Sequence, residues 1–92
     1  MDYLRPMDNM YTIYTKPGCI YCKMVIELLQ KSTQSVDEVP CEEYIAHSKP
    51  LFFQFIRELS GSNHRTFPIV FINGRFIGGY TETKSFLESR FS

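Results

Sequence analysis

Long apolar runs are missing from this sequence. No stretch comes near the roughly 18 apolar residues that a membrane-spanning helix needs, and the opening MDYLRPMDNM lacks the apolar centre of a secretory signal. An excess of charge is missing too, because ten Lys and Arg residues offset ten Asp and Glu residues. A large polyanion such as DNA is therefore not indicated as a partner. We expect a protein of the reducing cytoplasm that binds neither membranes nor nucleic acid.

Cysteine is scarce, with three residues in a chain of 92. A small secreted scaffold usually carries about four or more cysteines spread along the chain, so a disulfide framework is not indicated. Cys19 and Cys22 form the one close pair. A bridge between them would close too small a loop to restrict the unfolded chain. A purely structural disulfide is therefore disfavoured.

A second Cys-x-x-Cys pair is also missing, which argues against a structural zinc site. The other candidate ligands are Cys41, His47 and His64, and they are scattered along the chain. We expect Cys41 to be a small strand residue, since free cysteine packs as a hydrophobe. Both histidines are expected in surface loops, with no part in the chemistry.

The length suits one domain with its own core, so residues 1–92 are treated as a single domain with a short N-terminal extension at 1–9. Apolar patterning and turn signals predict a strand at 10–14, a helix at 22–31, a strand at 39–45, a helix at 49–59, two hairpin strands within 67–80 and a helix at 81–91. The order β-α-β-α-β-β-α begins with a βαβ unit, which favours parallel strands. The fold class predicted is α/β, with a four-stranded mixed sheet flanked by three helices.

Local signals support these elements. In helix 49–59 the apolar residues recur at helical spacing, which predicts a face packed on the sheet, with a partner-binding face as the alternative. Pro50 suits the first turn of this helix and Gly61 suits its end. Asn73-Gly74 favours a two-residue hairpin turn. Thr81 is a candidate N-cap for the last helix.

The segment KPGCIYCK (16–23) places two thiols where the first strand gives way to the first helix. Cys-x-x-Cys near a βαβ unit is typical of a thioredoxin-like redox motif. Free N–H groups and the positive dipole end at a helix start stabilise an anion, and Lys16 adds a cation. Both effects lower the pKa of the Cys19 thiol below its reference of about 8.5, and thiolate is the nucleophile of disulfide exchange. Cys22, one helical turn later, is expected to act second.

Three sequence blocks in this order resemble the glutaredoxin family. They are YTKPGCIYC (14–22), RTFP (65–68) and VFINGRFIGGY (70–80), and the resemblance runs from Met10 to Phe91. It implies a thioredoxin-type fold and glutathione as reductant. The implied activity is glutathione-dependent thiol–disulfide oxidoreduction, acting on protein disulfides and on glutathione mixed disulfides.

The resemblance also implies roles for single residues. Cys19 would attack the substrate disulfide, and Cys22 would resolve protein disulfides. The implied glutathione contacts are Lys16 at the glycine carboxylate, Tyr21 beside the tripeptide, Thr66, Phe67 and a cis Pro68 along its backbone, Gly79 at the Gly-Gly corner, and Thr81 with Glu82 at the γ-glutamyl end. The alternative is that Lys16 is an ordinary solvated lysine and that Tyr21 only packs.

Two positions depart from the commonest family pattern. Ile20 stands where proline is usual, which frees a backbone N–H and one φ angle, and Glu82 stands where aspartate is expected. Non-proline variants imply an alternative function, an iron–sulfur carrier in which two copies of Cys19 and two glutathiones hold a [2Fe–2S] cluster. A third hypothesis is a redox domain that serves one client protein through helix 49–59. Otherwise we expect a monomer that acts on disulfide-containing client proteins and holds no metal.

Overall fold

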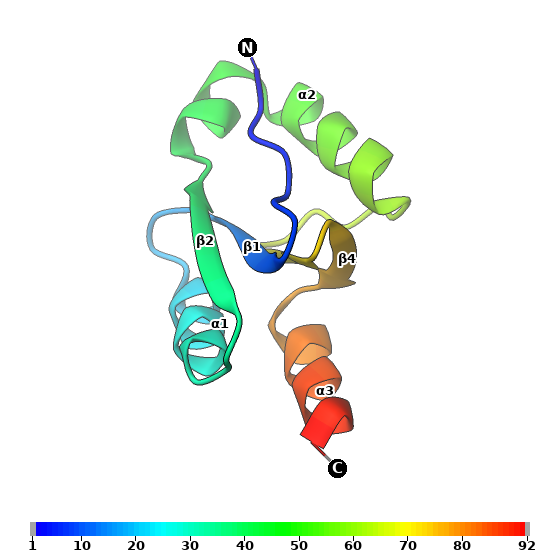
Figure 1. Cartoon of the computed structure of the whole chain (residues 1–92). Coiled ribbons are helices and arrows are strands. Elements are labelled where there is room, and N and C mark those ends of the chain that lie inside the picture. Colours follow the sequence, from blue (N-terminus) through cyan, green and yellow to red (C-terminus); the bar gives the residue numbers. More distant parts are fainter. Residues whose placement is uncertain (1, 92) are drawn as a thin grey trace.

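The computed structural model describes residues 2–91 as one four-stranded sheet with three helices (Figure 1). Along the chain the elements are β1 (Met10–Thr15), α1 (Ile20–Gln30), β2 (Ser35–Pro40), α2 (Glu42–Ser60), β3 (Ile69–Ile72), β4 (Arg75–Gly78) and α3 (Tyr80–Phe91). This order is the one predicted from the sequence. Among residues 2–91, no helix is both long and apolar enough to cross a membrane.

The strands lie in the order β2-β1-β3-β4, so β1 and β3 are central. β1 runs parallel to β2, with Tyr11 opposite Val36, as expected for the two strands of a βαβ unit. β3 runs antiparallel to both β1 and β4. Asn73 and Gly74 form the turn between β3 and β4 with φ angles of 50° and 77°, which suit this dipeptide. The predicted mixed sheet of the α/β class is confirmed.

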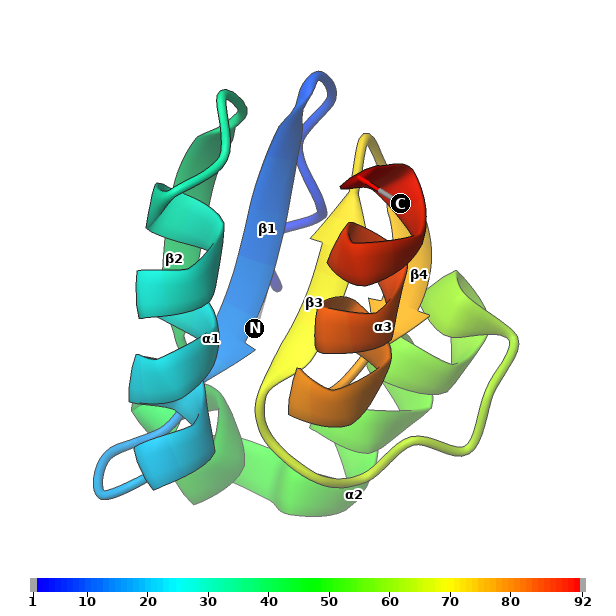
Figure 2. The ribbon, with the colours of Figure 1, turned by 90° about the horizontal axis from the view of Figure 1, so that it is seen from below.

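Side chains of β1 alternate between the two faces of the sheet, as the pleat requires. On one face, Tyr11 and Ile13 pack with Val25 and Leu29 of α1 and with Leu87 of α3. Figure 2 shows α1 and α3 side by side over this face. The two helices therefore bring their N-terminal turns to the same end of the sheet.

α2 covers the opposite face of the sheet (Figure 2). Phe52 and Ile56 are fully buried there, in one cluster with Tyr14 and Phe71 of the sheet. The apolar face of this helix therefore packs on the sheet, as predicted. Leu51, which lies beside that face, remains 52% exposed.

The residues before β1 run across the same face as α2 (Figure 1). The ring centroid of Tyr3 lies 4.8 Å from that of Phe55. The Tyr14 hydroxyl donates a hydrogen bond of 2.6 Å to the carbonyl of Leu4, and burial raises the pKa of Tyr14 well above its ordinary value. Tyr3 of the expected N-terminal extension thus packs against the core, whereas Leu4 and Met7 of the same extension are exposed.

One predicted element is wrong in its position. The sequence pattern predicts a strand at 39–45, whereas β2 ends at Pro40 and α2 begins at Glu42. β2 is an edge strand in which Val39 is the one fully buried residue, so its mostly polar sequence shows no apolar alternation. Tyr and Ile at 44 and 45 indicate a strand by propensity, but Glu42 and Glu43 in the first turn favour a helix through its dipole.

α2 consists of two parts that meet at Ser48, where φ and ψ of −164° and 106° interrupt the helix. The Ser48 hydroxyl accepts a hydrogen bond of 3.3 Å from the backbone N–H of Leu51, so Ser48 caps the second part. Pro50 lies in the first turn of this part, and Gly61 ends it with a left-handed φ of 68°. The helix predicted at 49–59 corresponds to the second part of α2.

Candidate active site

The turn between β1 and α1 fixes the position of the first thiol. Gly18 takes a φ of 70°, a left-handed conformation that glycine adopts without strain. Cys19 is then the N-cap residue of α1, and its Sγ accepts a hydrogen bond of 3.2 Å from the backbone N–H of Cys22. The sulfur therefore occupies the place where a serine or aspartate oxygen caps a helix, a place that favours negative charge.

Cys19 and Cys22 are joined by a disulfide, and their Cα atoms lie 5.3 Å apart. This separation is well within the range that a disulfide bond needs. Cys19 is 9% exposed and Cys22 is 3% exposed. The predicted pairing is confirmed, and the first sulfur belongs to the more accessible residue of the two.

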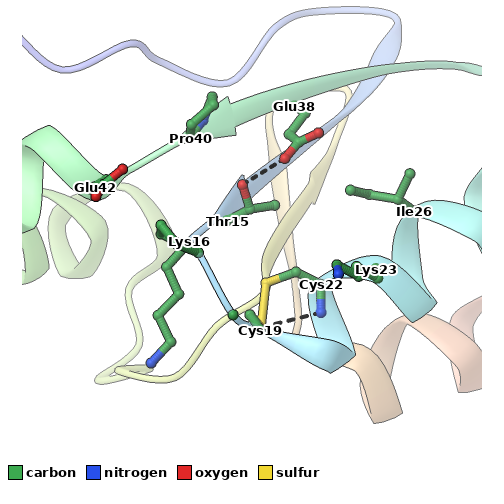
Figure 3. A pocket seen from close by; sticks show the side chains of 11 residues that line it. Thr15, Lys16, Cys19, Cys22, Lys23, Ile26, Glu38, Pro40 and Glu42 are labelled. Atoms are coloured by element: carbon green, nitrogen blue, oxygen red, sulfur yellow. Dashed lines mark hydrogen bonds between the residues drawn. A yellow bond between two sulfur atoms is a disulfide. The ribbon is translucent and has the colours of Figure 1, made fainter.

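A hollow of about 280 Å³ lies beside the thiol pair, against α1 and β2 (Figure 3). Lys16, Glu38 and Glu42 are among the residues that line it. Glu38 accepts a hydrogen bond of 2.9 Å from the hydroxyl of Thr15. In Figure 3 the ammonium group of Lys16 points away from both carboxylates, and it lies 5.7 Å from the ring centroid of Phe67. This cation is therefore directed toward a second hollow.

The second hollow, of about 410 Å³, lies between the starts of α1 and α3. Its walls come from α1, the loop before β3, the Gly-Gly corner and the first turn of α3. The residues that line it are Tyr21, His64, Thr66, Phe67, Pro68, Gly79, Tyr80, Thr81 and Glu82. Every glutathione contact implied by the sequence, except Lys16, thus lies around a single hollow, and one of them, Tyr21, comes from between the two cysteines in the chain.

Aromatic packing fixes two walls of this second hollow. The Phe67–Pro68 peptide bond is cis, as the resemblance implies. The ring of Phe67 stacks on that of Phe52 in the core, with centroids 6.1 Å apart and planes at 6°. On the other side, the rings of Tyr21 and Tyr80 lie 5.6 Å apart. Tyr21 is nevertheless 54% exposed, so most of its surface is open to a ligand or to solvent.

The first turn of α3 is capped by one of its own side chains. Glu82 Oε1 accepts a hydrogen bond of 2.8 Å from the backbone N–H of Gly79. A Cβ atom on Gly78 would lie 2.7 Å from that of Glu82, and φ there is 139°, so this corner requires glycine. Thr81 is not the N-cap, because α3 already begins at Tyr80. The carboxylate of Glu82 does the capping in its place.

The prediction that Cys41 is a strand residue is wrong. Cys41 follows β2 and is the N-cap residue of α2. It is fully buried, and its thiol donates a hydrogen bond of 3.3 Å to the carbonyl of Val39. Burial raises the pKa of the Cys41 thiol to about 12. This thiol is therefore protonated at neutral pH and unreactive.

Sequence reasoning missed two residues of the second hollow, His64 and Tyr80. His64 is expected in a surface loop, but it is partly buried and its ring packs edge-on to Phe76, with centroids 5.5 Å apart. Its place in the segment GSNH (61–64), shortly before RTFP, is the signal that could have found it. Tyr80 could have been found from its place directly after the Gly-Gly corner. His47 is exposed as expected, but it lies in α2 rather than in a loop.

Among residues 2–91, no group of three or more His, Cys, Asp or Glu side chains is placed to hold a metal ion. A cluster bridged by two copies of the chain would take its protein ligands from Cys19 alone. In this structure that sulfur is bonded to Cys22, and the remaining thiol, Cys41, is buried. The described residues therefore give no support to the iron–sulfur alternative, in which Cys19 of each copy would be the one protein ligand.

Comparison with known sequences gives a consistent assignment. The glutaredoxin family profile matches residues 11–77. A probable glutaredoxin of Acanthamoeba polyphaga mimivirus is 30% identical over 91 residues, which cover 89% of this chain and 81% of that protein. Glutaredoxin-2, mitochondrial, of Homo sapiens is 33% identical over 78 residues, and the match covers 83% of this chain but 44% of the human protein.

Solved structures share the fold. Glutaredoxin 1 from Francisella tularensis, complexed with cacodylate, has a TM-score of 0.75 and 27% identity, with 89% of this chain and 95% of that chain covered. The buckwheat glutaredoxin–glutathione complex has a TM-score of 0.70 and 23% identity, with 89% of this chain and 71% of that chain covered. With thiols paired at the start of α1 and a family profile that spans most of its length, the chain belongs to the glutaredoxin family.

Proposed function

We propose that the protein is a glutathione-dependent thiol–disulfide oxidoreductase that reduces protein disulfides and glutathione mixed disulfides. One observation carries the proposal: the sulfur of Cys19 caps α1 and is bonded to Cys22, and Tyr21, between the two in the chain, lines the hollow that holds most of the implied glutathione contacts. Ile20 and Tyr21, which lie between the two cysteines in the chain, are exposed, so this turn is at the surface where a disulfide substrate would approach.

Reduction of a client disulfide takes two exchange steps. The Cys19 thiolate attacks one sulfur of the client, the client disulfide breaks, and the other client sulfur leaves as a thiolate. Cys22, after losing its proton, then attacks Cys19 and releases the second client thiol. The enzyme is left with the Cys19–Cys22 disulfide, which is the state of this structure. Two glutathione molecules supply the two electrons that regenerate the dithiol and leave as glutathione disulfide.

A glutathione mixed disulfide needs Cys19 alone. The Cys19 thiolate attacks the glutathione sulfur, the client thiolate leaves, and glutathione becomes bonded to Cys19. A second glutathione, as thiolate, then attacks this bond and departs with the first as glutathione disulfide. The first route therefore requires Cys22 and the second does not, which makes the two routes separable by mutation.

The second hollow supplies the groups that an anionic tripeptide needs. Lys16, which is directed toward it, would pair with the glycine carboxylate. The backbone at Phe67, just before β3, would bond the central cysteine of glutathione as an added strand does. Tyr21 would flank the tripeptide, and the first turn of α3 at Thr81 and Glu82 would receive the γ-glutamyl end. The buckwheat glutaredoxin that shares this fold was crystallised with glutathione.

The assay is turnover of a glutathionylated peptide with reduced glutathione. We expect Cys19→Ser to lower turnover by at least about a thousandfold, since the nucleophile is lost. Cys22→Ser should keep turnover within about threefold of the wild type, yet lose reduction of a client protein disulfide, because the resolving thiol is missing. Cys41→Ser serves as the matched control and should leave both activities unchanged, since this thiol is buried. Full turnover by Cys19→Ser would disprove the proposal.

A further inference from the structure

His64 and Glu82 both lie close to Gly79, the residue that directly precedes α3. The backbone N–H of Gly79 donates to Glu82 Oε1. A Cβ atom built on Gly79 would lie 3.4 Å from Glu82 Oε1 and 3.4 Å from His64 Cε1. Both side chains also line the second hollow. An imidazole and a carboxylate thus converge on one backbone position, although they come from segments 18 residues apart in the chain.

The contacts of the imidazole ring orient its nitrogen edge toward the hollow. Cε1, the carbon between the two ring nitrogens, is the atom that faces Gly79. His64 Nε2 lies 3.5 Å from the hydroxyl oxygen of Thr66, and the ring packs on Phe76. The ring is therefore held by a β4 side chain while its polar edge adjoins the start of α3. Nothing in the packing against Phe76 requires a nitrogen, since an apolar ring would fill the same space.

The γ-glutamyl end of glutathione carries an α-carboxylate and an α-ammonium group, so its binding needs a donor and an acceptor close together. Resting on the proposed function, we propose that His64 is a specificity-determining residue that donates a hydrogen bond to the α-carboxylate of the γ-glutamyl group. Glu82 provides the complementary acceptor for the ammonium group, because a carboxylate has two oxygens and Gly79 uses one. The loop before β3 carries this donor to the site.

The test uses two substrates that differ at one group. The first is a fluorescent peptide glutathionylated on its single cysteine. The second is the same peptide carrying 4-aminobutyryl-cysteinyl-glycine, which lacks only the α-carboxylate of the γ-glutamyl group. Release of the peptide thiol by the reduced protein gives a half-saturation constant and a limiting rate for each substrate. The variants are His64→Ala and His64→Gln, with His47→Gln, the other histidine, as the matched control.

With the glutathionylated peptide, we expect His64→Ala to raise the half-saturation constant by about tenfold at an unchanged limiting rate, since a hydrogen bond to a charged group is lost. With the substrate that lacks the carboxylate, wild type and His64→Ala should be alike. His64→Gln, whose amide can donate, should recover part of the affinity for glutathione. His47→Gln should match the wild type on both substrates.

Two results would overturn this inference, and they are distinguishable. If His64→Ala raises the half-saturation constant by the same factor for both substrates, or for neither, His64 does not bind the α-carboxylate. The proposed function would stand in that case. If the wild type fails to release the glutathionylated peptide at all, the proposed function fails and the inference falls with it. Equal thermal unfolding of the wild type and His64→Gln would establish that the fold is intact in the comparison.

Discussion

Two cysteines of this protein stand at equivalent places in the fold and differ in their chemistry. Cys19 is the N-cap residue of α1, directly after the β1 turn, and Cys41 is the N-cap residue of α2, directly after β2. β1 and β2 are parallel neighbours, so both helices begin at the same edge of the sheet. One sulfur is part of the redox pair, and the other is a buried thiol whose pKa is raised to about 12.

The difference lies in the direction of the hydrogen bonds and in burial. Cys19 Sγ accepts the N–H of Cys22, which favours a negative sulfur. Cys41 Sγ instead donates to the carbonyl of Val39 and makes no cap bond, which favours the protonated thiol. Cys41 also has no exposed surface. A position at a helix start therefore does not by itself produce a reactive thiol; it needs an accepted N–H and access to solvent.

The first turns of the two helices differ in the same sense. The first turn of α1 contains no acidic residue, whereas that of α2 contains Glu42 and Glu43. Carboxylates at a helix start satisfy the dipole but oppose a second negative charge nearby. In α1 the sulfur of Cys19 is therefore the group that interacts with the positive end of the helix dipole. In α2 the carboxylates of Glu42 and Glu43 already do so. This difference is visible in the sequence once the helix boundaries are known.

The largest expected contrast is in alkylation of the reduced protein by iodoacetamide at pH 7. The raised pKa of Cys41, about 12 against an ordinary 9.0, makes its thiolate roughly a thousandfold rarer than that of a free cysteine. We expect Cys41 to react at least about a thousandfold more slowly than Cys19, as measured by mass spectrometry of tryptic peptides. In urea the two rates should converge, which is the control. Native rates within tenfold of each other would break the comparison.

A smaller effect is expected in alkaline stability, measured by urea unfolding of the disulfide-bonded protein. The pKa of Cys41 is raised from 9.0 to about 12 in the folded state. The unfolded thiol therefore loses its proton first, so the stability linked to Cys41 is complete below pH 9 and is lost as pH rises toward 12. Between pH 9 and 11 we expect the wild type to lose on the order of 1.4 kcal/mol more per pH unit than Cys41→Ala.

Cys41→Ser is the second variant in this measurement, because its hydroxyl can still donate to the carbonyl of Val39 but does not titrate in this range. Its alkaline slope should match that of Cys41→Ala. Tyr14 is buried with a raised pKa, so part of the alkaline loss should remain in all three proteins. Identical slopes for the wild type and both variants would show that Cys41 does not hold its proton as described.

The smallest effect is expected when an acidic residue is placed in the first turn of α1, as in the first turn of α2. Ile20 is 62% exposed, so Ile20→Glu changes the charge at the helix start without opening the core. A carboxylate there disfavours the neighbouring thiolate, and we expect Cys19 to be alkylated about threefold more slowly at pH 7. Ile20→Gln is the neutral control and should match the wild type. Equal rates in the two variants would show that first-turn charge does not set this reactivity.

Most of the fold could be predicted because its signals are local. The turn at Asn73-Gly74 and the helix end at Gly61 follow from the backbone preferences of single residues, and both were found where the sequence indicates them. The prediction of a strand at 39–45 was wrong because β2 is an edge strand with little buried surface. Its pairing with β1 is a long-range contact, and the propensities of the residues after it favoured the wrong element.

In the site, too, features set by local sequence could be predicted and features set by long-range packing could not. Cys19 and Cys22 could be predicted from a short motif, because their pairing depends on a few neighbours in the chain, and the cis Pro68 was implied by the family resemblance. The capping of Gly79 by Glu82 and the placement of His64 could not, since they depend on how the loop before β3 packs against the start of α3. The sequence placed His64 in a loop, but the direction in which that loop carries the histidine was not visible in it.

The sequence alone determined the element order, the α/β class and the chemistry of the paired thiols, because these depend on periodicity, turn residues and the spacing of Cys19 and Cys22. Only the tertiary structure placed Cys41 at a second helix start and decided that its sulfur is buried there. Cys19 and Cys41 are both N-cap residues, and the packing of α2 on the sheet buries one while the turn after β1 leaves the other near the surface. Burial is a property of the assembled core, and no short stretch of sequence contains it.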